Sequence, residues 1–488
     1  MTVPNPNLTP TAEAEAAAPS DPSRRKRPTR SSQLFYIGTA GLVAALGYYF
    51  LNARTGDPLH LYIGLLILVN ATLPALLWAK RGDFSFPVFQ VFMLTAVTGY
   101  AIPLLNGQQQ LDQFSAANVT KAGFGVLLFQ IAANATYAMV RARPRTSSAW
   151  TAEIIAKNVT TYLESGMIFT TLYTAFILLT DWIPYEIQGV LRAVGYGIGI
   201  MASFILSRMW GQGVLPPRKK TMLVVLITLQ VLFSWTALFL IGGISILVLS
   251  FLGYVTGSKR LPLIPLAITV VIVGLLHNGK STMRFKYWEG GAPAPTVTEI
   301  PAFFIEWVGY SLDDEIALQR KEQSNRLLER TSLLHILCLV TSFTPERQPF
   351  LNGLTYGQIP SQFVPRFFWP NKPVGHISTH TLSIYYGLQQ EEDTGKTTIA
   401  FGLLSEAYAN FGYFGLIAIG MIFAGVFKIV SDRAAYSPIL SYPGLFQIVL
   451  MAWSFQSEMT LSIWISSLYQ ACVAVLGVPF VIRNLLGR

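Results

Sequence analysis

The chain has 488 residues, of which 52% are hydrophobic and only 12% are charged. A soluble globular protein usually carries about 25% charged residues, so this composition excludes an ordinary soluble domain and predicts a helical protein that crosses a membrane many times. In such a protein the net charge of +10 indicates basic cytoplasmic loops rather than nucleic-acid binding. Two cysteines exclude a disulfide framework. His376 and His380 lack an acidic partner at ligand spacing, so no metal is expected.

The N-terminal segment, residues 1–33, is rich in Ala, Pro, Ser and Thr and holds too little apolar surface to fold. Because the basic run Arg24–Arg27 lies near its end, we predict a disordered, basic cytoplasmic tail. The apolar run Leu34–Phe50 follows, and no small-residue cleavage site comes after it. This pattern indicates an uncleaved membrane anchor rather than a signal peptide.

The region 34–276 consists mainly of apolar blocks near the length of about 20 residues that a membrane span needs. After the anchor, the predicted spans are Leu59–Ala79, Phe84–Leu105, Ala122–Val140, Tyr162–Leu179, Val190–Ser207, the block Thr221–Thr256 and Leu261–Leu276. The block Thr221–Thr256 is too long for one ordinary span, and its Gly242-Gly243 pair offers a turn, so we predict two short spans there. Basic residues fall in every second loop, as expected for cytoplasmic loops.

Three further spans are predicted in 408–488, at Tyr408–Val430, Gly444–Ser457 and Leu461–Ile482. If the C-terminal arginines are cytoplasmic, the long segment 277–407 lies outside, and counting forwards from the N-terminus gives the same answer. We therefore predict an all-α polytopic membrane protein with about 12 transmembrane helices and both termini in the cytoplasm. One large external loop, 277–407, should contain short helices.

The large loop opens with Lys280 and Arg284, which share a face at helical spacing and fit either lipid head groups or an anion site. The acidic triplet Asp313–Glu315 fits a helix surface better than a metal site. Further on, Leu333–Val340 is apolar but too short to span, which predicts a packed or re-entrant helix. His335 within it is either a satisfied core residue or a catalytic one.

Six prolines between Pro345 and Pro373 rule out a long helix and predict a shaped loop. In this loop Arg366 is followed by a Phe-Phe-Trp run that ends at Trp369, and Lys372 comes shortly after. Aromatic faces beside cations suit a bound sugar, but they equally suit a loop that lies in the membrane interface.

Distinctive motifs gather in Arg330–Gly415. They are RTSLLH at 330–335, GLTYGQIP at 353–360, VPRFFWPNKP at 364–373 and GLLSEAYANFGYFG at 402–415, with GKSTMR at 279–284 upstream. With these motifs the chain resembles the bacterial oligosaccharide repeat-unit polymerases, the O-antigen and exopolysaccharide polymerases of Wzy type. The spans before residue 277 match that family only in number and hydropathy.

The resemblance implies a glycosyltransferase at the outer face of the cytoplasmic (inner) membrane. Such enzymes transfer a growing glycan from one undecaprenyl-pyrophosphate carrier to the sugar of a new carrier-linked repeat unit, so donor and acceptor are both lipid-linked oligosaccharides. The lipid bilayer surrounds the enzyme, and a chain-length regulator and a flippase are further candidate partners. No cofactor, metal or nucleotide sugar is implied.

The proposed reaction requires cations, because a lipid pyrophosphate gains negative charge as it leaves and arginine pairs well with phosphate oxygens. It also requires a base or orienting acceptor for the attacking hydroxyl. Glu406 is the first choice for that role, and an ion pair with an arginine is its alternative. The catalytic candidates are Arg284, Arg330, Arg366, Glu406 and His335. The substrate-binding candidates are Lys280, Lys372, Tyr356, Trp369, Tyr408 and Asn410, and Glu458 is a weaker carboxylate candidate.

Two other classes of function are weighed. An O-antigen ligase uses the same donor and similar loop arginines and stays open, whereas a polyprenyl-phosphate-sugar transferase is disfavoured because the first external loop offers only Arg54 and Asp57. A polysaccharide transporter or flippase would be expected to show two similar halves and charges in mid-membrane. Here no such repeat is visible and the polar residues collect in one loop.

Overall fold

The computed structural model describes residues 33–82, 86–144, 159–179, 185–238, 240–293, 295–313, 332–364, 368–369, 371–394 and 398–486. All regular secondary structure within these ranges is helical. The predicted all-α class is therefore confirmed for this part of the chain, while the predicted N-terminal tail, up to residue 32, lies outside it.

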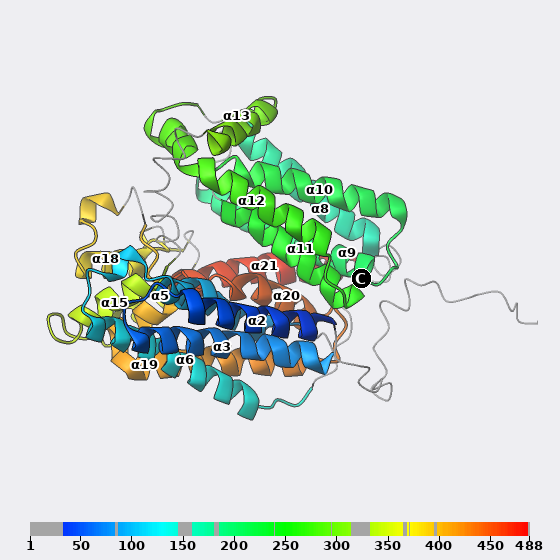
Figure 1. Ribbon diagram of the computed structural model, residues 1–488. Coiled ribbons are helices and arrows are strands. Elements are labelled where there is room, and N and C mark those ends of the chain that lie inside the picture. Colours follow the sequence, from blue (N-terminus) through cyan, green and yellow to red (C-terminus); the bar gives the residue numbers. More distant parts are fainter. Residues whose placement is uncertain are drawn as a thin grey trace, which may run out of the picture.

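The N-terminal and C-terminal helices form one layered bundle (Figure 1). Its long members pack side by side, with α6 lying along α19 and α3 lying against both α6 and α4. The bounds are α2 (Gln33–Asn52), α3 (Pro58–Arg81), α4 (Val88–Ala96), η1 (Val97–Ala101), α5 (Ile102–Leu105), η2 (Gln109–Leu111), α6 (Ala116–Met139), α19 (Gly402–Ala434), α20 (Tyr442–Ser454) and α21 (Leu461–Leu486).

The middle of the chain forms a second group of helices above this bundle in Figure 1. The group joins the bundle through α9, which packs against α8 and α11 on one side and against α20 and α21 on the other. The bounds are α8 (Val159–Leu179), α9 (Tyr185–Gly211), α10 (Pro217–Trp235), α11 (Leu240–Ser258), α12 (Leu263–Arg284), η3 (Phe285–Glu289) and α13 (Ile300–Leu312).

Six helical stretches in the described residues are long and apolar enough to cross a membrane. They are α2, α3, the continuous stretch Val88–Leu105, α6, Leu263–Lys280 of α12, and α19. Each coincides with a predicted span, and no side chain of α2 is fully buried, as expected for a helix with one face towards lipid. The other predicted spans coincide with α8–α11, α20 and α21. These helices support a helical membrane protein, and the total of about 12 spans stays a prediction.

The block Thr221–Thr256 forms two helices, α10 and α11, as predicted, but the position predicted for the turn is wrong. The turn includes residues 236–238, where Leu238 has a φ of 58°, and does not lie at Gly242-Gly243. A Cβ on Gly243 would overlap the indole of Trp235, whose Nε1 donates to the Leu240 carbonyl at 2.9 Å. The glycine pair therefore permits α11 to pack closely against the end of α10.

The segment predicted as the large loop contains short helices in its described part. They are η3 and α13, followed by α15 (Leu334–Phe343), α16 (Leu354–Gly357), α17 (Ile359–Gln362), α18 (Ile377–Tyr385) and η4 (Glu391–Asp393). At the loop's two ends the flanking helices extend into it, because α12 continues to Arg284 and α19 already begins at Gly402. The acidic triplet falls mostly in 314–331, outside the described residues.

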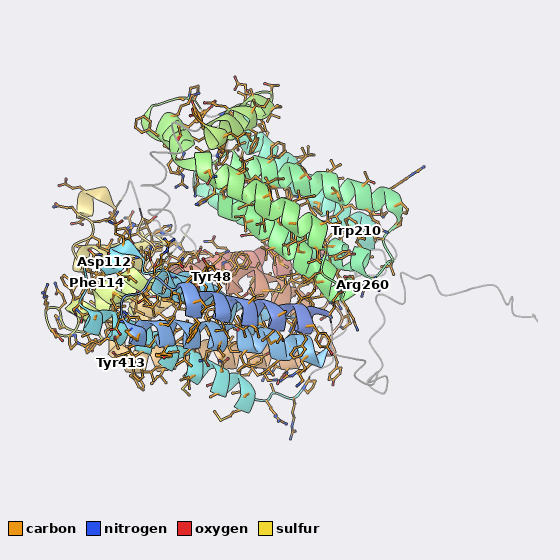
Figure 2. All side chains as sticks on the ribbon, in the orientation of Figure 1. Tyr48, Asp112, Phe114, Trp210, Arg260 and Tyr413 are labelled. Carbon is orange, nitrogen blue, oxygen red and sulfur yellow. The ribbon has the colours of Figure 1, made fainter. Side chains whose placement is uncertain are left out.

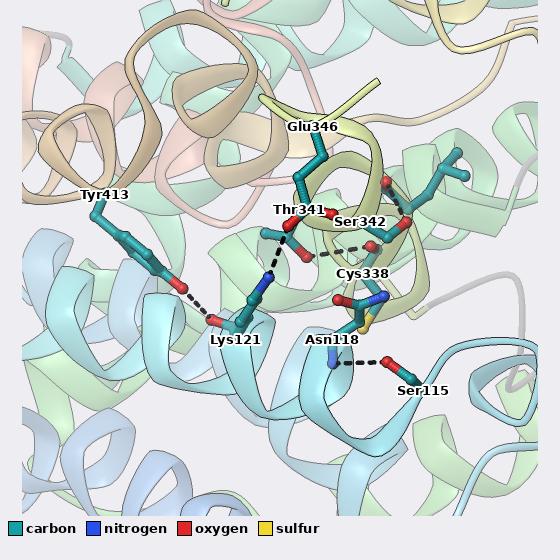
Figure 3. Close-up of polar contacts among 9 residues, drawn as sticks. Ser115, Asn118, Lys121, Cys338, Thr341, Ser342, Glu346 and Tyr413 are labelled. Carbon is teal, nitrogen blue, oxygen red and sulfur yellow. Dashed lines mark hydrogen bonds and ion pairs between the residues drawn. The ribbon is translucent and has the colours of Figure 1, made fainter. Parts of the chain in front are cut away.

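Helix α15 is the packed helix that its short apolar sequence predicts. Leu334, Leu337 and Cys338 are fully buried, and the helix lies against both α6 and α19. Figure 3 shows how the turn after α15 is tied to α6 by an ion pair between Lys121 and Glu346, with 3.2 Å between Nζ and Oε1. Both side chains are largely exposed, so this pair orients the turn more than it stabilises the fold.

Candidate functional site

The first nine residues of α19 form a buried segment, 402–410, that is separated from the rest of the helix by a break. Phe411 (φ −141°, ψ 15°) and Gly412 (φ 61°, ψ −145°) both leave the helical conformation. The backbone of Gly412 lies in a region that is essentially restricted to glycine, because a Cβ would clash there. The NFGYFG motif therefore marks a kink, and the long span runs on from that point.

The kink leaves backbone carbonyls without helical partners, and a loop from the large segment supplies donors to them. Leu351 N donates to the Ala409 carbonyl at 3.0 Å, and Asn352 N donates to the Asn410 carbonyl at 3.2 Å. The side-chain oxygen of Asn410 accepts a further bond from Gly353 N at 3.0 Å. These three bonds fix the loop 351–353, and with it α16, on the buried segment 402–410.

Asn410 is fully buried and positions its neighbours. Its Nδ2 donates to Thr355 Oγ1 and to the Glu406 carbonyl, both at 2.8 Å. Because both amide protons are used within the protein, the structure supports a positioning role for Asn410. The predicted contact with a sugar hydroxyl would have to use the remaining lone pair of Oδ1.

Glu406 is fully buried, and its two carboxylate oxygens have different surroundings. Oε2 accepts a hydrogen bond of 2.6 Å from Leu461 N, at the start of α21, where the helix dipole favours a negative charge. The Thr355 hydroxyl lies beside the carboxylate, yet Oε1 makes no hydrogen bond of ordinary geometry to any residue that the structure describes. One oxygen is thus fixed by a backbone donor, and the other makes no such bond to the described residues.

The elements around Glu406 carry further buried polar groups that lack partners in the described ranges, namely Ser405 Oγ, Ser462 Oγ and His380 Nε2. These elements converge, since α16 contacts α18, α19 and α21. A hydrogen bond of 3.1 Å between the hydroxyls of Thr379 and Thr460 joins α18 to the start of α21. The result is a buried layer of hydroxyl, imidazole and carboxylate groups where four helices meet.

Of the two predicted tyrosines, Tyr356 borders this layer and Tyr408 has a separate aromatic environment. The ring of Tyr356 lies 6.1 Å from that of Phe411, and burial, together with the negative charge of Glu406, raises the pKa of the Tyr356 phenol well above its usual value. The phenol therefore stays protonated and can donate a hydrogen bond. Tyr408 packs against Phe350 and against Tyr413, whose ring centroid is 5.3 Å away.

The ring of Tyr413, just past the kink, is anchored in turn to α6. Its hydroxyl donates to the Lys121 carbonyl at 3.2 Å, as Figure 3 shows. Because the Lys121 side chain also pairs with the turn after α15, this one residue connects α6, α15 and α19. This end of the bundle is therefore held together by contacts between segments far apart in sequence.

Three other predicted residues have different surroundings. Lys372 Nζ donates to the carbonyls of Val364 and Gln362, at 2.8 and 3.4 Å, and so fixes the end of α17. Trp369 is 43% exposed. Burial lowers the pKa of His335 and outweighs a hydrogen bond to the Ser332 backbone, which raises that pKa. This imidazole is therefore neutral at pH 7.

Arg284 and Lys280 lie in the second group of helices, not beside Glu406. Their helix, α12, packs against α13 and more lightly against α11, away from α15 and α18 (Figure 1). The guanidinium of Arg284 donates twice to the Leu238 carbonyl, at 2.9 and 3.2 Å, and lies 4.3 Å from the ring centroid of Trp288. Arg284 thereby closes the turn between α10 and α11. Arg330 and Arg366 lie outside the described residues.

The structure thus brings Glu406, Asn410 and Tyr356 together, whereas Tyr408 packs against Phe350 and Tyr413. It adds Thr355 and the backbone N–H of Leu461, which sequence reasoning missed. Thr355 lies within the GLTYGQIP motif, so the sequence could have indicated its role, whereas no sequence pattern indicates a backbone donor. Among the described residues no group of three or more His, Cys, Asp or Glu side chains could hold a metal ion.

No protein-family model, curated protein or solved structure matches this chain. The functional interpretation therefore rests on the motifs of Arg330–Gly415 and on the geometry around Glu406.

Proposed function

We propose that the protein is a glycosyltransferase that polymerises undecaprenyl-pyrophosphate-linked oligosaccharide repeat units at the outer face of the inner membrane. The observation that carries this proposal is the Glu406 carboxylate, buried and held through Oε2 while Oε1 makes no hydrogen bond of ordinary geometry to the described residues. A carboxylate held in this way can orient the acceptor hydroxyl and take its proton as the glycosidic bond forms.

The chemistry around Glu406 supports a ligand rich in hydroxyl groups. Buried polar atoms without a hydrogen bond are few in native proteins and call for an explanation, and here Ser405, Ser462 and His380 contribute such atoms on helices that meet near Glu406. A saccharide offers both donors and acceptors, so it can satisfy all of them. The protonated Tyr356 phenol adds a donor and an aromatic face.

In this proposal the leaving pyrophosphate is stabilised by Arg330 and Arg366. In the sequence, Arg330 precedes the segment that enters α15, which packs against α19, and Arg366 comes shortly after the end of α17, which Lys372 holds. A guanidinium can form two parallel hydrogen bonds to phosphate oxygens, and such a contact strengthens as charge builds on the leaving group. Arg284 and Lys280 remain candidates for a second contact with a lipid-linked anion.

Deletion of the gene is expected to leave single repeat units on the surface glycan and to remove the long chains, because repeat units are still made and transferred but not joined. Electrophoresis of the surface glycan measures this directly. Loss of all transfer to the final acceptor would instead support a ligase. An unchanged glycan would contradict both.

Arg366→Ala is expected to reduce polymerisation by about 10²- to 10³-fold, the loss usual when one preorganised group that stabilises developing charge is removed. The readout is the chain-length distribution in the deletion strain that carries the variant, at matched protein levels. Arg347→Ala is the matched control. Arg347 belongs to the same segment, but its guanidinium lies over the Phe343 ring at 5.0 Å. Equal chain lengths in the two variants would remove Arg366 from the site.

A further inference from the structure

A groove between α8 and α10, in the second group of helices, is not used by the function proposed above. It has a volume of about 580 Å³, within the range of roughly 300–1,000 Å³ typical of small-molecule sites. Its lining is Ile168 from α8 with Arg218, Thr221, Met222, Val225 and Leu226 from α10. The groove is therefore an apolar channel with one arginine.

Arg218 stands in the first turn of α10 and is exposed, with no hydrogen bond or ion pair to the described residues. Helix α10 begins with Pro217 and then carries Arg218, Lys219 and Lys220, and this turn has neither an acidic residue nor a side-chain cap. The N-terminus of a helix already carries positive partial charge, so three cations there are unfavourable unless an anion offsets them.

Among the described residues, an anion faces only one of these three cations. Lys219 Nζ lies 3.4 Å from Oε2 of Glu164 and donates to Thr160 Oγ1 at 2.6 Å. This contact holds α8 against α10 and so fixes the walls of the groove. Arg218, which lines the groove, is left without a compensating negative charge among the described residues, at the end of an apolar channel.

A ligand that matches both features is an anionic amphiphile, with its chain in the channel and its phosphate against the cations. Basic pockets between transmembrane helices bind the head groups of anionic lipids in this way, and the loop before α10 is predicted to be cytoplasmic from its charge. We propose that the groove binds one acyl chain of an anionic bilayer phospholipid, with the lipid phosphate paired to Arg218. This proposal is independent of the glycosyltransferase function.

The test uses the purified full-length protein in detergent, titrated with phosphatidylglycerol or phosphatidylcholine, with bound lipid counted by native mass spectrometry. Phosphatidylglycerol should be retained selectively, and Arg218→Ala should weaken that retention about tenfold, as expected for loss of one charge-assisted hydrogen bond. Arg260→Ala is the matched control. Arg260 is exposed and lies at the same end of the second group of helices as Trp210, which is in the last turn of α9 (Figure 2). Equal retention of the two lipids, or equal loss in both variants, would overturn the proposal.

A second pair of variants tests the channel itself. Val225→Trp should fill the groove and weaken phosphatidylglycerol retention, whereas Val224→Trp should not, because Val224 is similarly exposed (46% against 49%) but does not line the groove. Full displacement of the lipid by millimolar inorganic phosphate would mean that the cations bind phosphate alone and would contradict the acyl-chain assignment. Preferential retention of undecaprenyl phosphate would contradict the assignment to a bilayer phospholipid.

Discussion

Glu406→Gln is expected to abolish the long chains of the surface glycan while the protein accumulates at its normal level. Glutamine has the same size and keeps a side-chain oxygen for Leu461 N, so the start of α21 should be held as before. The substitution removes the negative charge and the base, which typically costs a factor of about 10²–10⁴ in rate. Chain length and protein level, measured in the same complemented deletion strain, give the two readouts.

Glu458→Gln is the matched control for this result. Glu458 lies in the turn between α20 and α21, where burial also raises the pKa of its carboxyl, but its contact with α19 is made by the backbone carbonyl, which accepts from Gly402 N at 2.9 Å. Its substitution should therefore leave chain length near normal. Long chains in the Glu406→Gln strain would refute the assigned role. If Glu406→Gln lowered the thermal stability of the protein as much as Glu406→Leu does, the carboxylate would have a purely structural role.

Gly412→Ala is expected to destabilise the protein and to shorten the glycan. Alanine at φ 61°, ψ −145° is strained, at a cost of about 1–3 kcal/mol, and its Cβ would lie 3.1 Å from the Phe350 ring. Relief of that strain would straighten the kink and withdraw the carbonyls of Ala409 and Asn410 from the loop 351–353. A lower melting temperature of the purified protein measures the effect.

The control for the kink is Gly425→Ala, in the same helix. There the nearest atom to a new Cβ is Cγ2 of Thr136 at 3.8 Å, an ordinary contact, and alanine favours helix over glycine by up to about 1 kcal/mol. The melting temperature should be unchanged or slightly higher. If both variants melt at the same temperature as the parent protein, the kink does not depend on glycine.

Much of the fold was predictable because membrane helices are encoded locally. A run of about 20 apolar residues between polar ends is sufficient to indicate a span, and α2, α3, α6 and α19 all follow such runs. The turn before α11 was predicted at the wrong place because a glycine pair can signal either a turn or a close contact. Only the position of Trp235, a tertiary fact, decides between them.

The candidate site was predictable only in part. Glu406 stood out as a lone carboxylate in an uncharged segment, and the structure shows it buried with one oxygen paired. Its partner is a backbone N–H that follows 55 residues later, which no side-chain pattern reveals. Asn410 was predicted to hold sugar hydroxyls, but the break at Gly412 turns its amide towards Gly353 and Thr355. Tertiary geometry determines these roles.

The pairing of the loop 351–353 with the kinked helix has a consequence for insertions and deletions. Leu351, Asn352 and Gly353 each donate one N–H to a fixed acceptor on Ala409 or Asn410. One residue inserted among them would shift every later donor by a position and carry Thr355 away from the Asn410 amide. A surface loop usually tolerates changes in length, but this one has a register, as a β-strand does, although the described residues contain no sheet. Its length is therefore as constrained as its sequence.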